Sequence, residues 1–114
     1  MEDIKSYLNP SLEESIELYD LTIVLDNPEH PTTAKYIHII TIKNTSLNDR
    51  LNWSYIIPSN KQKINNIHVK DSQGALEYSL EEINSDKTKL SFFYREPIRP
   101  QQYYKFTFVY ETEI

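Results

Sequence analysis

The side chains that could carry chemistry are few and widely spaced in this sequence. The three histidines, His30, His38 and His68, belong to no metal-ligand pattern such as HxH or HExxH. The chain has no cysteine, which excludes disulfides, thiolate metal sites and cysteine nucleophiles. We expect no metal and no cofactor. We expect one half-buried histidine on a central strand and two histidines at the surface.

Carboxylate pairs and phosphate-binding loops are also missing from the sequence. Glu81 and Glu82 are adjacent, so on a strand their side chains point to opposite faces. The single glycine, Gly74, cannot build a phosphate-binding loop, and there is no nucleophile elbow. The sequence therefore predicts a protein that is not an enzyme.

One run, REPIRPQQYYKFTFVYE at residues 95–111, combines side chains that are common in binding surfaces. If the strands beside EPIRPQQ pair residue 94 with residue 104, Phe93 faces Lys105 and Arg95 faces Tyr103 towards solvent. Aromatic residues and arginine dominate protein-binding hot spots. We therefore predict a partner-binding cluster, extended by the loop residues, that consists of Phe93, Arg95, Ile98, Arg99, Tyr103 and Lys105. The alternative is that these aromatic and cationic side chains only stabilise the sheet.

The elements that position these residues are strands, because the apolar residues recur with a period of two. The predicted strands are residues 15–25, 34–43, 51–57, 64–70, 75–80, 88–95 and 103–110. The parity of the apolar residues changes within 15–25, which predicts a bulge near Tyr19 and Asp20 or two short strands. Segment 34–43 has apolar residues on both parities, as expected for a central strand that is buried on both faces.

Two hairpins follow from the turn residues and the apolar faces. Asp71 and Gly74 suit a tight turn that pairs residue 70 with 75, residue 69 with 76 and Ile67 with Tyr78. The other is the hairpin across EPIRPQQ, in which Phe92 faces Phe106 and Leu90 faces Phe108.

About seven antiparallel strands separated by turns predict an all-β sandwich, immunoglobulin-like in architecture, with a partly open barrel as the alternative. Leu51, Trp53, Tyr55 and Ile57 share one face in this prediction, with the indole of Trp53 packed between the sheets. We expect a loose N-terminal lead-in at residues 1–14 and a single domain at residues 15–114.

The net charge of −5 is unevenly distributed, because residues 1–30 carry eight acidic residues and one lysine. Six basic residues lie between Lys35 and Lys70, but no nucleic-acid motif accompanies them, so we predict no nucleic-acid binding. We also predict no membrane-spanning segment, because the apolar runs are too short. The expected location is cytoplasmic if the chain is complete and extracytoplasmic if it is an excised domain.

The strand pattern ITIKNTS…LNWSYIIP…INNIHVKDSQGALEY…KLSFFYREPIRPQQYYKFTFVYE covers roughly residues 16–111. It resembles the β-sandwich domains of ribophorin-like proteins, the N-terminal β-domains of zinc aminopeptidases and the extracytoplasmic domains of archaeal membrane proteins. In these families a glycine usually occupies the last corner, where this chain has Gln101 or Gln102. The resemblance carries no catalytic residue. It implies a scaffold or interaction module attached to something larger.

We therefore expect a non-catalytic interaction or structural module that acts through a sheet face or edge and belongs to a larger or membrane-associated protein. We expect a protein partner. The alternatives are a carbohydrate-binding module, motivated by the nine tyrosines and one tryptophan, and an accessory β-domain of an enzyme.

Overall fold

Residues 14–114 are described in a computed structural model of the chain. Residues 1–13, most of the predicted lead-in, lie outside the described residues. Glu14, the last residue of the predicted lead-in, already belongs to the first strand. The elements are β1 (Glu14–Leu25), β2 (Thr33–Asn44), β3 (Arg50–Ile57), the 3₁₀ helix η2 (Lys61–Lys63), β4 (Ile64–Asp71), β5 (Gly74–Ala75), β6 (Tyr78–Asn84), β7 (Lys87–Ile98) and β8 (Tyr103–Glu113).

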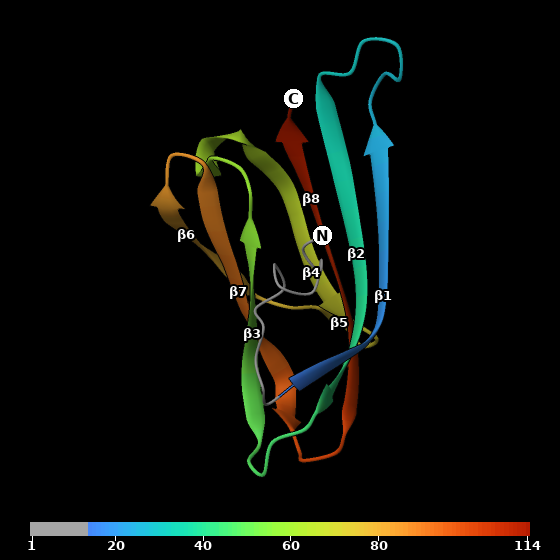
Figure 1. The fold of residues 1–114 in the computed structure, drawn as a ribbon, viewed down its shortest axis with the longest axis vertical. Coiled ribbons are helices and arrows are strands. Elements are labelled where there is room, and N and C mark those ends of the chain that lie inside the picture. The colour runs from blue at the N-terminus through green and yellow to red at the C-terminus, as the bar shows by residue number, and fades with distance from the viewer. Residues whose placement is uncertain (1–13) are drawn as a thin grey trace, which may run out of the picture.

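The strands form two antiparallel sheets that pack face to face. The larger sheet has the order β1-β2-β8-β4-β5, and the smaller has the order β3-β7-β6. Figure 1 shows the smaller sheet on the left and the β1, β2 and β8 strands of the larger sheet on the right. The predicted all-β antiparallel fold is confirmed. The described residues form eight strands where about seven were predicted, and one of the eight, β5, has only two residues.

The core consists of aromatic and branched side chains that meet between the two sheets. The ring centroid of Phe106 on β8 lies 4.8 Å from that of Trp53 and 5.0 Å from that of Phe92. Both of these partners belong to the smaller sheet, so the rings join the two layers. The indole of Trp53 is buried between the sheets, as predicted, although β3 is an edge strand of its sheet.

The predicted hairpin between β7 and β8 is wrong, because the two strands lie in different sheets. The chain crosses from one layer to the other in the loop after Ile98. The side-chain parity was nevertheless right. Phe92 meets Phe106, and Tyr94 meets Tyr104 with ring centroids 5.0 Å apart, but these pairs meet across the core and not along a ladder. Alternation specifies which face is buried. It does not specify whether two buried faces are neighbours in one sheet or opposed in two.

The turn at Gly74 is confirmed, but the hairpin that follows it is short. Lys70 pairs with Ala75, and Gly74 adopts a φ of 134°, a conformation that favours glycine. After the Leu76 amide donates to the carbonyl of Val69, the chain leaves the larger sheet. Tyr78 therefore pairs with Phe92 in the smaller sheet and not with Ile67.

Strands β1 and β3 each contain a register shift, and both shifts correct details of the sequence prediction. In β1 the shift lies between Ile16 and Leu18, so the strand is continuous and its bulge precedes the predicted position at Tyr19. In β3 a shift between Arg50 and Asn52 turns Leu51 out of the core, and Leu51 is 55% exposed.

Strand β2 is central, as predicted, because it pairs with β1 on one side and with β8 on the other. The expectation that it is buried on both faces is wrong. Most of its inner residues are buried, whereas Ile37 and Ile39 on the outer face are half-buried, because no further layer of the described residues covers the larger sheet.

Candidate functional site

The structure separates the six residues of the predicted binding cluster. Phe93 pairs with Asn52 on the outer face of the smaller sheet and is 68% exposed. Tyr103 and Lys105 lie on the outer face of the larger sheet, where they pair with Lys43 and Thr41. Phe93 therefore does not face Lys105, and Arg95 is not a cross-strand neighbour of Tyr103, although Arg95 and Tyr103 both line one hollow beside Asp71.

Arg95 holds the two sheets together. Its Nε donates to Oδ2 of Asp71 at 3.0 Å, and its Nη2 donates to Oδ1 of Asp71 at 3.0 Å and to the Ala75 carbonyl at 3.2 Å. Tyr104 donates a further hydrogen bond of 2.8 Å to Oδ2 of Asp71. These bonds, that of Arg95 above all, lower the pKa of the Asp71 carboxyl to about 2.

The two loop residues of the predicted cluster also differ from each other. Ile98 was expected at the surface and is instead 4% exposed, as part of the core. Arg99 is exposed in the loop between β7 and β8, where its amide donates to Oε1 of Gln102. Five members of the cluster are exposed, but they lie on opposite layers and in a loop, so the six residues do not form one patch.

The histidines differ from the prediction in one respect. His30 and His68 are exposed, as expected, but His38 is 1% exposed and not half-buried. Among residues 14–114, no three histidine or acidic side chains gather in a way that could hold a metal ion.

A small cavity lies beside His38 between the two sheets. Its volume is about 120 Å³, and four tyrosines line it together with the imidazole. We call it the tyrosine–histidine cavity, and its defining residues are Tyr19, Tyr36, His38, Tyr55 and Tyr110. The sequence could have indicated it, because Tyr55 and Tyr110 lie on inward-facing parities. What the sequence does not show is that β3 and β8 place them around one histidine of β2.

The imidazole of His38 is held by stacking and by one hydrogen bond. Its ring lies 4.2 Å from that of Phe108 at an interplanar angle of 10°. Its Nδ1 is 2.6 Å from the hydroxyl oxygen of Tyr19, whereas Nε2 has no hydrogen-bond partner within the described part of the chain. Burial lowers the pKa of His38 to about 4, so the ring is neutral at pH 7. Burial also raises the pKa values of Tyr19, Tyr55 and Tyr110.

The cavity is therefore uncharged and lined by phenol hydroxyls, one imidazole and aromatic faces. Its volume is well below the roughly 300–1,000 Å³ of ordinary ligand pockets. It has room for a few water molecules, each of which occupies about 30 Å³ in the liquid. The cavity is too small to be an ordinary ligand site.

Strand β1 is the more prominent feature of this side of the molecule. It has twelve residues and lies at the edge of the larger sheet, where it pairs with β2 alone among the described strands. Leu18 is 69% exposed, Ile23 53%, Val24 48% and Leu25 39%. Natural proteins usually shorten, bend or charge such an edge, because its unpaired backbone groups accept another strand.

The smaller sheet leaves the far half of β1 uncovered. Tyr55 on β3 packs against His38 and Phe108, which belong to β2 and β8. Figure 1 shows that the β1–β2 hairpin extends beyond the end of β3 at the top of the molecule. The uncovered inner side of this hairpin, which we call the inner shelf, consists of Ile23 and Leu25. Leu21 and Tyr36 beside them are half-buried and line the tyrosine–histidine cavity.

The register shows which backbone groups of β1 are available. The amide of Asp26 donates to the carbonyl of Thr33 at 3.2 Å, so these two residues form a hydrogen-bonded pair. Hydrogen-bonded and non-hydrogen-bonded pairs alternate in an antiparallel ladder. Residues 18, 20, 22 and 24 therefore bond to β2, and the backbone groups of residues 19, 21, 23 and 25 point to the free edge.

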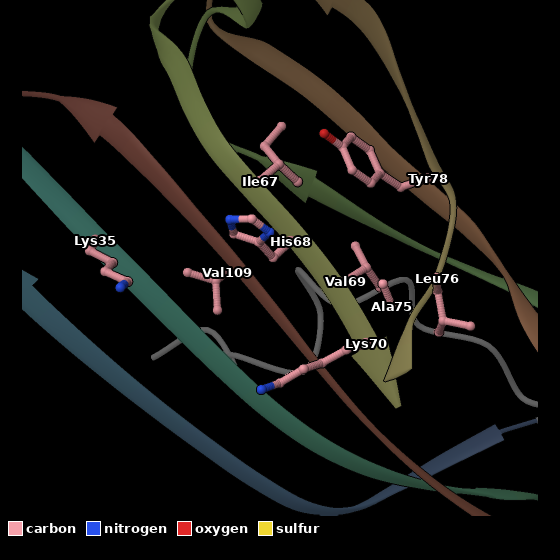
Figure 2. Close-up of a pocket in the computed structure, with 9 residues that line it drawn as sticks. All are labelled: Lys35, Ile67, His68, Val69, Lys70, Ala75, Leu76, Tyr78 and Val109. Carbon is pink, nitrogen blue, oxygen red and sulfur yellow. The ribbon is translucent and has the colours of Figure 1, made fainter. Parts of the chain in front are cut away.

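Further hollows lie elsewhere on the described part of the molecule. One, of about 210 Å³, is lined by Arg95, Ile98 and Tyr103 of the predicted cluster together with Asp71 and Tyr104. Two are larger. One, of about 400 Å³, follows β4, and Figure 2 shows Lys35 and Lys70 on one side of that strand and Tyr78 on the other. Its charged groups are exposed side chains that do not converge on a common point.

The other hollow, of about 420 Å³, lies on the outer face of the smaller sheet. It is lined by the exposed ring of Phe93, which pairs with Asn52, and by Glu77, Ser79 and Ser91.

Comparison with known proteins gives no family for this chain. No protein-family model matches the sequence, and no curated protein matches it. Within residues 14–114, no helix is long and apolar enough to cross a membrane.

Proposed function

We propose that this chain is a non-catalytic interaction module that binds an extended segment of a partner protein along the edge strand β1. The observation that carries the proposal is the exposure of four apolar side chains on one long edge strand with unpaired backbone groups. In strand addition, backbone hydrogen bonds supply much of the affinity and alternate side chains supply specificity.

The inner shelf supports this function. A strand added beside β1 places every second side chain on the inner side of the larger sheet. There these side chains cover Ile23 and Leu25, which are exposed in the free chain. Binding thus removes apolar surface from water and at the same time gives the unpaired backbone groups of β1 hydrogen-bond partners.

The wider setting of the module is part of the same proposal. We place it among immunoglobulin-like sandwiches of the kind found in the families that the sequence resembles, as one part of a larger or membrane-associated protein. One difference is that the last strand, β8, is central in the larger sheet here. In the immunoglobulin order the last strand belongs to the smaller sheet.

The test uses two variants at one residue, Ile23. Ile23→Pro removes an amide at the free edge and leaves the bonds to β2 in place, because proline is tolerated on edge strands. Ile23→Thr keeps the amide and the branched shape. Linear peptides selected against the wild-type chain should bind Ile23→Thr and lose at least tenfold in affinity for Ile23→Pro. Equal affinity for both variants, with both folded by circular dichroism, would overturn the proposal.

Carbohydrate binding is the second candidate, and one observation favours it. The hollow on the smaller sheet sets the exposed ring of Phe93 beside an amide and a carboxylate, the groups that sugars require. Against it, Trp53, Tyr55 and Tyr110 are buried in the core. A glycan that binds the wild-type chain and not Phe93→Ser would establish this function. Binding that survives this substitution would place the glycan elsewhere.

A further inference from the structure

The charges beside the free edge of β1 indicate which kind of segment it accepts. We infer that β1 selects an extended segment that alternates apolar and basic side chains, and that it disfavours a second copy of this chain. This inference rests on the proposed strand addition at β1. It adds the chemical class of the partner.

The inner positions of the incoming strand must be apolar. Its inward side chains lie beside Leu21, Ile23 and Leu25, which pair with His38, Tyr36 and Ala34 on the inner face of β2. None of these six side chains is charged at pH 7, since burial keeps His38 neutral. An ionic side chain placed here would lose water without gaining a partner.

The outer positions of the incoming strand favour positive charge. Asp20 lies on the outer face of β1, is exposed, and faces Ile39 on the neighbouring strand. Its carboxylate thus has no cation opposite it on β2. Glu17, at the bulge, is exposed too, and among the described residues its carboxylate accepts one hydrogen bond, of 2.6 Å from Ser15. Two cations of the described residues lie near the start of β1. Arg50 pairs with Glu14 at 2.9 Å, and Lys43, opposite Ser15, has its Nζ 5.5 Å from the ring centroid of Tyr103.

The same charges act against pairing between two copies. Strand β1 contains acidic residues and no lysine or arginine, so a β1–β1 pair would bring Glu17 and Asp20 of both copies together without a cation. Like charges on facing strands are destabilising, whereas opposite charges contribute about 0.2–1 kcal/mol per pair. Pairing with β1 is therefore electrostatically favourable for a basic strand and unfavourable for a second copy of β1.

The test compares two capped eight-residue peptides, one of alternating valine and lysine and one of alternating valine and glutamate. Binding to the full chain is followed by backbone amide NMR shifts. The valine–lysine peptide should shift the amides of residues 18–25 and bind at least fivefold more tightly than the valine–glutamate peptide. Asp20→Lys should reduce the affinity for the valine–lysine peptide about fivefold, because it removes one strong cross-strand charge pair.

The matched control is Asp86→Lys, which makes the same change in net charge in the exposed turn between β6 and β7. It should change the affinity less than twofold. An equal effect of Asp86→Lys and Asp20→Lys would overturn the inference, because net charge alone would then explain binding. Equal binding of both peptides at residues 18–25 would overturn the charge selection and leave strand addition intact. No shift at residues 18–25 with either peptide would overturn both.

Discussion

At the scale of single residues, His38 is the side chain whose environment departs most from expectation. It is neutral, stacked on Phe108, and bonded to Tyr19 through one nitrogen only. The groups around it are Tyr19, Tyr55, Tyr110 and Phe108, and none of them is charged at pH 7. Protonation therefore gains no ionic partner in the folded state.

This environment predicts a loss of stability in mild acid. The pKa of His38 falls from 6.5 to about 4 on folding, so the unfolded chain binds a proton first as the pH decreases. The contribution of His38 is complete above pH 6.5 and is lost between pH 6.5 and about 4. Urea unfolding at pH 4.5 should give a free energy about 2–3 kcal/mol lower than at pH 7.

Two variants separate His38 from other groups that titrate. His38→Phe keeps a flat ring in the core and should remove most of this loss, whereas His68→Gln, at an exposed site, should retain it. The carboxyl of Asp71, with a pKa of about 2, contributes only at lower pH. If His38→Phe loses as much stability between pH 7 and pH 4.5 as the wild-type chain, the imidazole does not cause the acid sensitivity.

Gln101 is a second residue whose backbone predicts a measurable effect. It has a φ of 70° in the corner where the resembled families usually have glycine. A residue with a side chain loses about 1–2 kcal/mol in this left-handed region, and glycine does not. After the greater chain entropy of glycine is allowed for, Gln101→Gly should raise the free energy of unfolding by about 0.5–1 kcal/mol.

The neighbouring residue provides the control for this substitution. Gln102 does not have a positive φ, and its side chain accepts a hydrogen bond from the Arg99 amide at 2.9 Å. Gln102→Gly should therefore lower the stability. If both substitutions destabilise the chain in urea unfolding, the backbone conformation at position 101 does not carry the cost that we assign to it.

At the scale of elements, the sequence predicted the strands and their buried faces well. Alternation identified Leu90, Phe92 and Tyr94 as one inward face and Phe106 and Phe108 as another, and all five are buried. It could not place the two strands in separate sheets, because the same alternation fits both arrangements. The binding cluster depended on that pairing, and it failed for this reason.

The edge strand shows the second limit of sequence patterns. The apolar residues of β1 alternate as they would in a half-buried strand, and alternation alone does not tell whether Ile23 and Leu25 are covered. They do point inward. They are exposed because the smaller sheet has three strands and does not reach them, and coverage of this kind depends on the whole assembly. The tyrosine–histidine cavity escaped prediction for a similar reason.

At the scale of the whole molecule, two ion pairs connect the layers. Glu14 on β1 accepts hydrogen bonds from Arg50 and Tyr94 of the smaller sheet, and Asp71 on β4 pairs with Arg95 on β7. Both acidic side chains are 4% exposed. Removing either arginine would leave a largely covered carboxylate without its ionic partner, which destabilises the folded state. These pairs fix one sheet relative to the other, and with it the edge that remains uncovered.

The central claim is that β1 accepts another strand at its free edge, and amide hydrogen exchange of residues 18–25 tests it most directly. In the free chain, the amides of residues 18, 20, 22 and 24 should exchange slowly, and those of residues 19, 21, 23 and 25 should exchange fast. With the valine–lysine peptide in excess, the fast group should become at least tenfold slower. If these four amides stay fast while the peptide is bound, the partner does not add a strand to β1 and the account is wrong.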